Sequence, residues 1–355
     1  PYYITTRNGA RCSSAVAFLW PAKQRRNLTV MTGVTVTKLI MRDRRAVGVA
    51  ADQHGRSQIF SARAEIILAA GAIGSPHVLQ LSGVGPAALS QSCGIDVVYD
   101  QPNVGQHMQD HLGINYFHMA NRPTLNNILG SWPRLMLAGM RYILQRQGPL
   151  SLGVNQLGVL LRATPDAPRP DTQIYINPLT YRVTDPYKRR LTKPDRAPGF
   201  IFSFNACRPY STGSVSITSA DASIAPAIHG NYLDDQRDLH DVVRMARFIG
   251  RLQNSPAVQK ILAEPPETDL LTMSDDAIID DFRARSGTVF HPCSTCRMGP
   301  DQRRFVVDTD LRVHGIEGVR VADASVFPNI TSANTNAPTI MVAHKAAELI
   351  LQSQR

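Results

Sequence analysis

The fold is decided by residues 65–81, which read EIILAAGAIGSPHVLQL. Residues 65–70 form a nearly continuous apolar run, which is typical of a strand covered on both faces within a parallel sheet. Gly71 interrupts the run, and Ser75 followed by Pro76 is typical of the first residues of a helix. A strand, a glycine turn and a helix start in this order predict a doubly wound α/β domain, in which such a unit places nucleotide phosphates or cofactor rings.

The sequence on either side extends this pattern. Short β-branched runs separated by turn residues predict strands upstream, at residues 28–31, 34–41, 46–51 and 57–60. Near the other end of the chain we expect a strand at 319–321 and a helix at 337–351.

Residues 112–290 combine alternating strand patterns with amphipathic helices, which predicts an inserted domain with an antiparallel sheet. We expect helices at 132–145, 239–252 and 275–285, and strands at 172–177, 199–206 and 214–218. The last two strands flank the turn 211–213 and are predicted to form a hairpin. The predicted fold class is α/β (α+β overall), with one domain made of residues 1–111 and 291–355 and a second made of 112–290.

The composition is that of an ordinary globular protein large enough for two domains: 355 residues, 43% hydrophobic and 19% charged. No apolar run approaches the roughly 20 residues of a membrane helix, so we expect no transmembrane segment. The net charge is +10, but the basic clusters at 23–26, 42–45 and 188–190 are short, far apart and without interleaved aromatic residues. This distribution argues against nucleic-acid binding and favours a solvated basic surface that attracts anionic partners.

The five cysteines argue against a disulfide scaffold and are typical of a reducing compartment, so we expect a cytoplasmic protein, free or peripheral to a membrane. Cys293 and Cys296 form a C-x-x-C, as in zinc deaminases, but no H-x-E precedes it and no second C-x-x-C follows. His107 and His111 lie four residues apart, and a connecting segment is favoured there over a metal site. No metal is predicted.

Five motifs resemble those of the glucose–methanol–choline (GMC) flavin oxidoreductases. Residues 71–85 (GAIGSPHVLQLSGVG) are similar to the family's second signature, and residues 103–111 (NVGQHMQDH) to its connecting segment. Residues 291–299 (HPCSTCRMG) resemble its HPxGTxxMG element, and residues 321–328 and 334–339 resemble its C-terminal flavin-contacting elements. The resemblance covers essentially the whole chain and is nearest to the choline dehydrogenase and alcohol dehydrogenase branch.

The sequence departs from the family pattern in two places. Ser294 stands where the family has glycine. The GxGxxG unit that opens the family's first domain is absent, because the near-match at 83–88 follows a helix and not a strand. We therefore expect the C-terminal portion of a longer enzyme, lacking its first βαβ unit, which in isolation binds FAD poorly.

The resemblance implies FAD-dependent oxidation of a primary alcohol to an aldehyde. His291 would be the base that takes the hydroxyl proton, since imidazole titrates near neutrality, while hydride passes to flavin N5. Asn336 would hold the alkoxide, with Asn334 as the alternative if the register shifts. From the residues alone, a hydrogen-bonded core histidine is the favoured reading of His291, and the N-cap of the helix that follows is the alternative reading of Asn336.

Seven further residues match the family's cofactor contacts. The carboxylate of Asp323 follows a strand and would bind the ribityl or pyrophosphate groups, although a turn or N-cap role is the alternative. The predicted FAD contacts are Val36, Ala70, Gly71, Asp323, Ala324, Ala337 and Thr339.

The implied partners are a small alcohol and an acceptor that is either quinone-like or oxygen. Tyr175 lies on a predicted strand of the inserted domain with no neighbouring acid, so an uncharged primary alcohol is at least as consistent as choline. Two rival functions remain open. One is a hydroxynitrile lyase of the same family, in which the flavin is only structural, and the other is an inactive truncated fragment.

Overall fold

The computed structural model describes residues 4–153, 155, 157–181 and 193–353, so the basic cluster at 188–190 lies outside the described residues. The chain divides into two compact units. Unit 1 comprises residues 1–28, 112–207 and 236–287, and unit 2 comprises residues 29–111, 208–235 and 288–355. Both combine helices and strands, and the antiparallel sheet predicted for the middle of the chain is present, which confirms the mixed α/β class.

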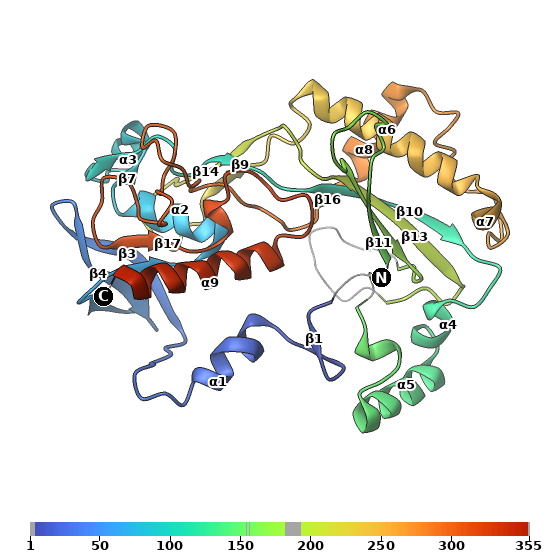
Figure 1. Ribbon diagram of the computed structural model, residues 1–355, viewed down its shortest axis with the longest axis horizontal. Helices are drawn as coiled ribbons and strands as arrows, with labels where there is room; N and C mark the ends of the chain where they lie inside the picture. Colours follow the sequence, from blue (N-terminus) through green and yellow to red (C-terminus); the bar gives the residue numbers. More distant parts are fainter. Residues whose placement is uncertain (1–3, 154, 156, 182–192, 354–355) are drawn as a thin grey trace. The chain divides into compact units, whose positions relative to one another are not determined.

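A pair of parallel strands lies in the core of unit 2 (Figure 1). Strand β6 (Ile66–Leu68) pairs with β17 (Val319–Val321), which confirms both predicted strands. The short helix η3 (Ala324–Val326) follows β17, and the long helix α9 (Asn336–Ser353) ends the unit, close to the prediction of 337–351. Because β6 and β17 run the same way, Gly71 and Asp323 emerge at the same edge of this sheet.

Helix α2 (Gly71–Leu81) begins five residues before Pro76, the predicted first helical residue, so Pro76 lies inside the helix. The hydroxyl of Ser75 does not cap a helix, because it accepts the N–H of Ala70 at 3.1 Å and donates elsewhere. A proline within a helix leaves the carbonyl four residues earlier without its usual donor. Here that carbonyl belongs to Ala72, and it accepts the hydroxyl of Thr295 at 2.6 Å. The hydrogen bond from Thr295 therefore allows Pro76 to lie inside the helix, although the local sequence predicts a helix start there.

An antiparallel sheet joins β3 (Val34–Arg42), β4 (Arg45–Gln53) and β5 (Arg56–Ser61) in unit 2, which confirms three of the four predicted strands. The predicted strand at 28–31 is wrong, since no strand is assigned there and these residues are exposed. Its β-branched residues find no partner strand in the described chain.

A second antiparallel sheet of unit 2 has the order β15-β14-β9. It consists of β9 (Gln106–Met108), β14 (Gly213–Ser216) and β15 (Ala227–His229). The predicted hairpin is therefore wrong, because β14 pairs with β9 and β15 and not with the strand at 199–206. Gln80 of α2 favours this pairing, since its buried amide donates to Val104 and Val215 at 3.1 and 3.0 Å. The unit also contains β7 (Val84–Gly85), β8 (Tyr99–Asp100) and α3 (Ala87–Ser92).

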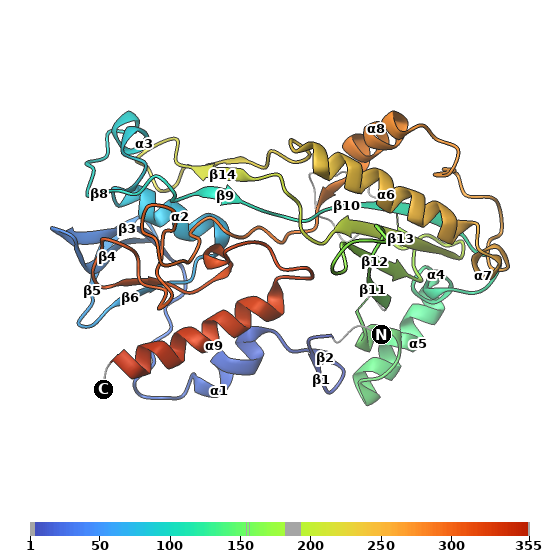
Figure 2. The same ribbon diagram turned by 45° about the horizontal axis from the view of Figure 1, so that its top comes forward.

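Unit 1 is built on a sheet of order β11-β12-β13-β10-β16, with β16 (Gly287–Thr288) at the boundary of the unit. Its strands β12 (Thr172–Asn177) and β13 (Gly199–Ala206) match the prediction, and β10 (Leu112–Met119) and β11 (Leu157–Leu161) complete it. Helices α6 (Gln236–Gln253) and α8 (Asp275–Arg285) lie over one face, as Figure 2 shows. Phe204 and Phe282 pack there with ring centroids 5.8 Å apart, and both are buried.

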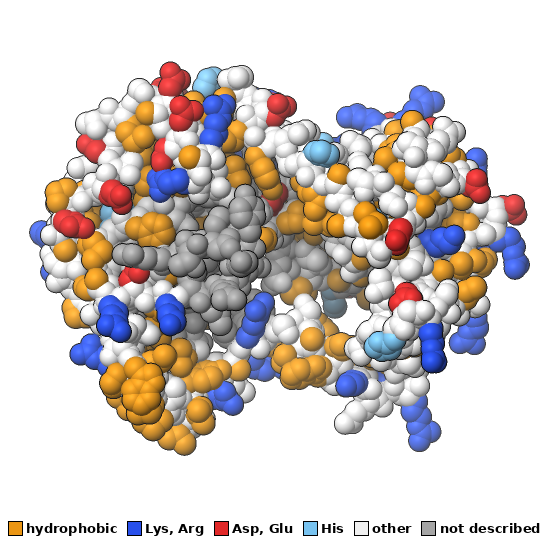
Figure 3. Space-filling view, turned by 180° about the vertical axis from the view of Figure 1, so that it is seen from behind, with side chains coloured by type: hydrophobic (Ala, Val, Ile, Leu, Met, Phe, Trp, Pro, Cys, Tyr) orange, Lys and Arg blue, Asp and Glu red, His pale blue; other side chains and the backbone are white. Residues whose placement is uncertain are grey.

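The remaining elements of unit 1 are short apart from α5 (Trp132–Gln145), which confirms a predicted helix. Figure 3 shows hydrophobic side chains gathered over α5, with Lys and Arg side chains beside them. The short elements are β1 (Thr6–Arg7), β2 (Ala10–Arg11), η1 (Ala15–Leu19), α1 (Trp20–Ala22), α4 (Leu125–Leu129), η2 (Pro149–Ser151) and α7 (Pro256–Gln259). None of the helices in the described ranges is long and apolar enough to cross a bilayer.

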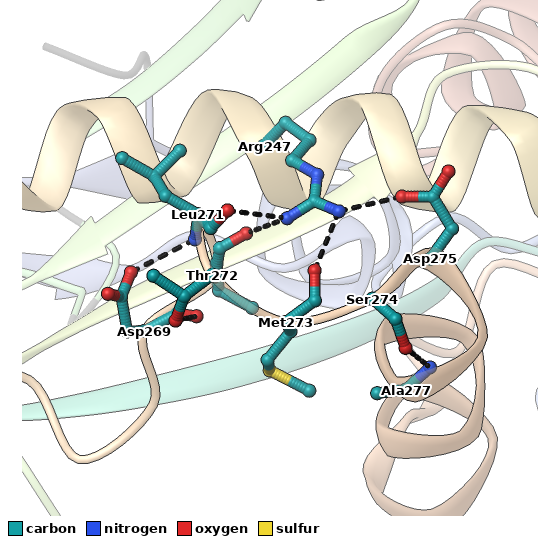
Figure 4. A network of polar contacts seen from close by, with 9 residues as sticks. Arg247, Asp269, Leu271, Thr272, Met273, Ser274, Asp275 and Ala277 are labelled. Atoms are coloured by element: carbon teal, nitrogen blue, oxygen red, sulfur yellow. Dashed lines mark hydrogen bonds and ion pairs between the residues drawn. The ribbon is translucent and has the colours of Figure 1, made fainter.

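Arg247 of α6 ties this helix to the start of α8 (Figure 4). Its guanidinium donates to the carbonyls of Leu270, Leu271 and Met273 at 2.6, 3.1 and 2.8 Å. It also pairs with Asp275, the first residue of α8, at 2.7 Å. One side chain thus satisfies three carbonyls of an irregular segment and pairs with the first residue of α8.

The two units depart from the predicted domain boundaries at residues 1–28, 208–235 and 288–290. Residues 208–235 belong to unit 2, because they supply β14 and β15 to the sheet that contains β9. Residues 1–28 belong to unit 1, where Gly9 packs so tightly on α5 that an added Cβ would lie 2.0 Å from the carbonyl oxygen of Arg146. Contacts between segments distant in sequence set these boundaries. The composition of each segment does not indicate which distant segment it contacts, so the boundaries could not be predicted.

Candidate active site

His291 is positioned through its backbone in unit 2. Phe290 has a left-handed φ of 64°, so the chain turns directly before His291. The carboxylate of Asp110 accepts the N–H of His291 at 2.8 Å and the hydroxyl of Tyr232 at 2.7 Å. It also accepts the hydroxyl of Thr288. A buried carboxylate with three donors holds the loop in one conformation.

The imidazoles of His291 and His111 are hydrogen-bonded to each other. Their Nδ1 atoms lie 2.9 Å apart, and the rings meet edge to face at 87°. One Nδ1 must therefore carry a proton and the other must accept it. His111 is fully buried, and its carbonyl accepts the N–H of Val289 at 3.0 Å.

Asn334 contacts the other nitrogen of the same ring. Its Nδ2 lies 3.1 Å from Nε2 of His291. An amide nitrogen only donates, so Nε2 of His291 is the acceptor and carries no proton. His291 is then protonated on Nδ1 and donates to His111. Its tautomer is set from both sides, and the lone pair of Nε2 points toward the exposed Asn334.

The structure separates the two asparagine candidates. Asn336 is the first residue of α9 and is exposed, whereas Asn334 precedes the helix and contacts His291. The contact with His291 favours Asn334, the alternative candidate, over Asn336.

The surroundings keep His291 neutral. Burial and, to a lesser extent, neighbouring His111 lower the pKa of His291 to about 4, although Asp110 acts in the opposite direction. At neutral pH the imidazole is therefore an unprotonated base.

The C-x-x-C segment is structural in this fold. Both thiols are fully buried, and burial raises the pKa of Cys293 to about 12 and also raises that of Cys296. Cys293 pairs with Gln109 through backbone hydrogen bonds of 2.9 and 3.2 Å. Ser294 has a φ of 69°, a left-handed conformation that costs a residue with a side chain roughly 1–2 kcal/mol and explains why glycine suits this position. Within the described ranges, no group of three His, Cys, Asp or Glu side chains is arranged to hold a metal.

Asp323 is buried at the sheet edge that the parallel pair creates. Its carboxylate accepts the N–H of Gly71 at 2.9 Å, the hydroxyl of Ser75 at 2.5 Å and the N–H of Ser325 at 2.8 Å. It thus caps both α2 and η3, as the turn or N-cap alternative expected. Ala324 follows it and accepts the N–H of Ser294 at 3.1 Å.

Four of the five other predicted cofactor contacts lie on open parts of unit 2. Ala70 is exposed at the end of β6, and a Cβ added to Gly71, whose φ is 81°, would meet no atom within 4 Å. Ala337 is exposed in the first turn of α9, and Val36 is 38% exposed on β3. Thr339 is turned into its own helix, since its N–H and hydroxyl both donate to Thr335.

Sequence reasoning missed Asp110, His111, Tyr232 and Thr288. The first two end the segment 103–111, which the sequence identified only as a connecting segment. The available signal was a carboxylate followed by an imidazole, Asp110 and His111, shortly after the strand β9. Tyr232 and Thr288 carried none, because their roles depend on pairing with distant residues.

Comparisons with known proteins identify the family of the chain. Family models described as GMC oxidoreductase match residues 2–113 and 209–343. The alcohol dehydrogenase [acceptor] of Pseudomonas putida is 36% identical over 99% of this chain, and the oxygen-dependent choline dehydrogenase of Photobacterium profundum is 35% identical over 99%. The chain spans 63% and 61% of their respective lengths.

Two solved structures are also similar. Formate oxidase of Aspergillus oryzae RIB40 has a TM-score of 0.89 at 26% identity, covering 98% of this chain and 64% of that protein. Pyridoxine 4-oxidase from Mesorbium loti has a TM-score of 0.81 at 25% identity, covering 97% of this chain and 62% of that protein. The family models cover well over half of the chain and agree with these relatives and with the motifs at 71–85 and 291–299. The chain belongs to the GMC oxidoreductase family.

Proposed function

We propose that this chain takes part in the FAD-dependent oxidation of a primary alcohol to an aldehyde, with His291 as the base. The observation that carries the proposal is the state of His291. It is neutral, protonated on Nδ1 toward His111, and presents the lone pair of Nε2 beside the amide of Asn334.

Unit 2 fits a flavin dinucleotide. The exposed Ala70 and the open space beside Gly71 leave room for a large group at the carboxyl edge of the β6–β17 pair. The first N–H groups of α9 have no partner within the helix and carry partial positive charge, which suits the pyrimidine edge of the ring. The residues that would hold the cofactor are Val36, Ala70, Gly71, Asp323, Ala324, Ala337 and Thr339. When bound, FAD supplies the acceptor for the substrate hydride.

The chain's own residues then have distinct roles. His291 takes the hydroxyl proton of the alcohol on Nε2, and the imidazolium that forms is stabilised by Nδ1 of His111 and by the charge of Asp110. Asn334 donates from Nδ2 to the substrate oxygen as negative charge develops on it. The substrate oxygen would lie where the two side chains now meet. We propose an uncharged primary alcohol as substrate and a quinone-like acceptor or oxygen as the final oxidant.

Anaerobic mixing of the flavin-loaded protein with a primary alcohol tests the proposal. Loss of the flavin absorbance at the rate of aldehyde formation supports it. A lyase would turn over a hydroxynitrile with no loss of colour. Failure of the chain to retain stoichiometric FAD would point to the inactive alternative.

Replacing Asn334 with alanine is expected to lower the rate constant of flavin reduction by about 10²-fold, because one hydrogen bond to the developing oxyanion is lost. The Asn336→Ala variant is the matched control, and its rate should change less than about threefold, as expected of a helix-end substitution. Stopped-flow measurement of both variants decides between the two positions. A larger loss in Asn336→Ala would restore the original assignment.

The pH dependence of flavin reduction is expected to reflect the lowered pKa of His291. A base acts only when it is unprotonated, so the rate falls as the pH drops through its pKa. With a pKa of about 4, the rate should be flat from neutral pH down to about 5 and should fall only below that. Circular dichroism at each pH controls for acid unfolding. A midpoint near the ordinary histidine value of about 6.5 would contradict this prediction.

A further inference from the structure

Helix α5 of unit 1 exposes most of its apolar side chains. Trp132, Leu137, Ile143 and Leu144 are 73%, 63%, 71% and 81% exposed, and Met136 and Met140 are about half exposed. Ala138 is buried. The exposed surface is therefore far richer in apolar groups than that of an ordinary surface helix.

These side chains form one continuous face. At about 100° per residue, six of them fall within an arc of roughly 140° around the helix axis. In order around the arc they are Trp132, Ile143, Met136, Met140, Leu144 and Leu137. Ala138 falls outside the arc, on the side that packs against the unit. We call this arc the apolar face of α5. Among the described residues, these six side chains are about half exposed or more.

The apolar face is bordered by positive charge. Arg134 and Arg141 are exposed and lie next to Leu137 on the helix surface, and Arg146 follows the last turn. Residues 111–165 contain no Asp or Glu, so no acid neutralises these arginines within that stretch. Figure 3 shows the Lys and Arg side chains beside the hydrophobic cluster. An apolar stripe with an aromatic residue and a basic border is the pattern of a helix that lies in a membrane interface.

We propose that the apolar face of α5 docks unit 1 onto a bilayer surface that carries anionic phospholipids. The apolar side chains enter the boundary between headgroups and acyl chains, and the arginines bind headgroup phosphates. The charge pattern favours lipid over a second copy of this chain. A symmetric contact would bring Arg134 and Arg141 against an equally acid-free surface. The inference is independent of the chemistry proposed for unit 2.

The purified full chain allows a direct test. Its two tryptophans are Trp20 and Trp132, so a Trp20→Phe variant reports from α5 alone. With vesicles of equal parts phosphatidylglycerol and phosphatidylcholine, we expect co-sedimentation, a blue shift of Trp132 emission and quenching by brominated acyl chains. Added salt and pure phosphatidylcholine should both weaken the binding.

Two pairs of substitutions separate the contributions. The Leu137→Glu and Leu144→Glu pair should weaken vesicle binding by at least about tenfold, since two buried apolar contacts are lost. The Arg134→Gln and Arg141→Gln pair should weaken it by about fivefold for each arginine. Ile59→Glu with Ile228→Glu is the matched control, because both residues are exposed in unit 2 and should not affect binding. Circular dichroism confirms that each variant is folded.

The opposite results overturn the proposal. They are no sedimentation with anionic vesicles, or binding that the Leu137→Glu and Leu144→Glu pair leaves unchanged. Equal binding to pure phosphatidylcholine would also count against it. A blue shift of Trp132 that appears without lipid and grows with protein concentration would assign the face to a second copy instead.

Discussion

Replacing His291 with alanine is expected to lower the rate constant of flavin reduction by about 10²–10⁴-fold, the usual contribution of a general base. The imidazole is the group that presents an unprotonated nitrogen beside Asn334, and its tautomer is set by His111. Anaerobic stopped-flow absorbance of the flavin-loaded variant measures the effect. Substrate binding should change much less, because the lost interaction is made mainly in the transition state.

A matched histidine controls for nonspecific effects. His344 is exposed on α9 of the same unit, so His344→Ala should retain full activity. If His291→Ala reduces its flavin at the normal rate, His291 is only a hydrogen-bonded core histidine and the proposed base is wrong. A small amine or imidazole added to the buffer should partly restore the activity of His291→Ala if the base has been removed and the fold kept.

Replacing Asp323 with alanine is expected to destabilise the flavin-free protein by about 3–5 kcal/mol, because each hydrogen bond to a charged group contributes about 1.5–3 kcal/mol and the three share one carboxylate. The substitution leaves the N–H groups of Gly71 and Ser325 and the hydroxyl of Ser75 without their acceptor. Thermal unfolding should show a decrease in Tm on the order of 10 °C.

Measuring the flavin-free protein distinguishes the two roles of Asp323. If the carboxylate served only the cofactor, its removal would leave the stability of the flavin-free chain unchanged. The stability of the flavin-free Asp323→Asn variant should lie between those of the wild type and of Asp323→Ala, since the amide keeps one accepting oxygen. Asp280→Ala removes a carboxylate that is 76% exposed and should shift Tm by less than about 2 °C.

The elements that follow from local pattern were predicted well. The strands at 172–177 and 199–206 and the helices at 132–145 and 275–285 coincide with the structure, because hydrophobic periodicity and turn residues are local properties. Pairing is not local. The strand Gly213–Ser216 pairs with the strand Gln106–Met108, more than a hundred positions earlier in the chain. The predicted hairpin was therefore wrong.

The candidate site shows the same division. Position in a motif pointed to His291, but the motif does not state which asparagine reaches its ring. Asn334 and Asn336 differ by two positions at a helix start, where sequence patterns are least exact. The pairing of His111 with His291 spans 180 positions and appears only when the chain is folded. The site residues therefore remain predictions whose test is kinetic.

The hydrogen bond from the Thr295 hydroxyl to the Ala72 carbonyl has a consequence for substitutions at positions 76 and 295. Proline at position 76 removes the donor that Ala72 needs, and a hydroxyl at position 295 replaces it. The segments 71–85 and 291–299 are thus coupled, because one supplies the carbonyl and the other its donor. The effects of substitutions at the two positions should therefore not be additive. Removing the Thr295 hydroxyl should lower stability while Pro76 is present. The same change should have little effect once position 76 carries a residue with a backbone N–H.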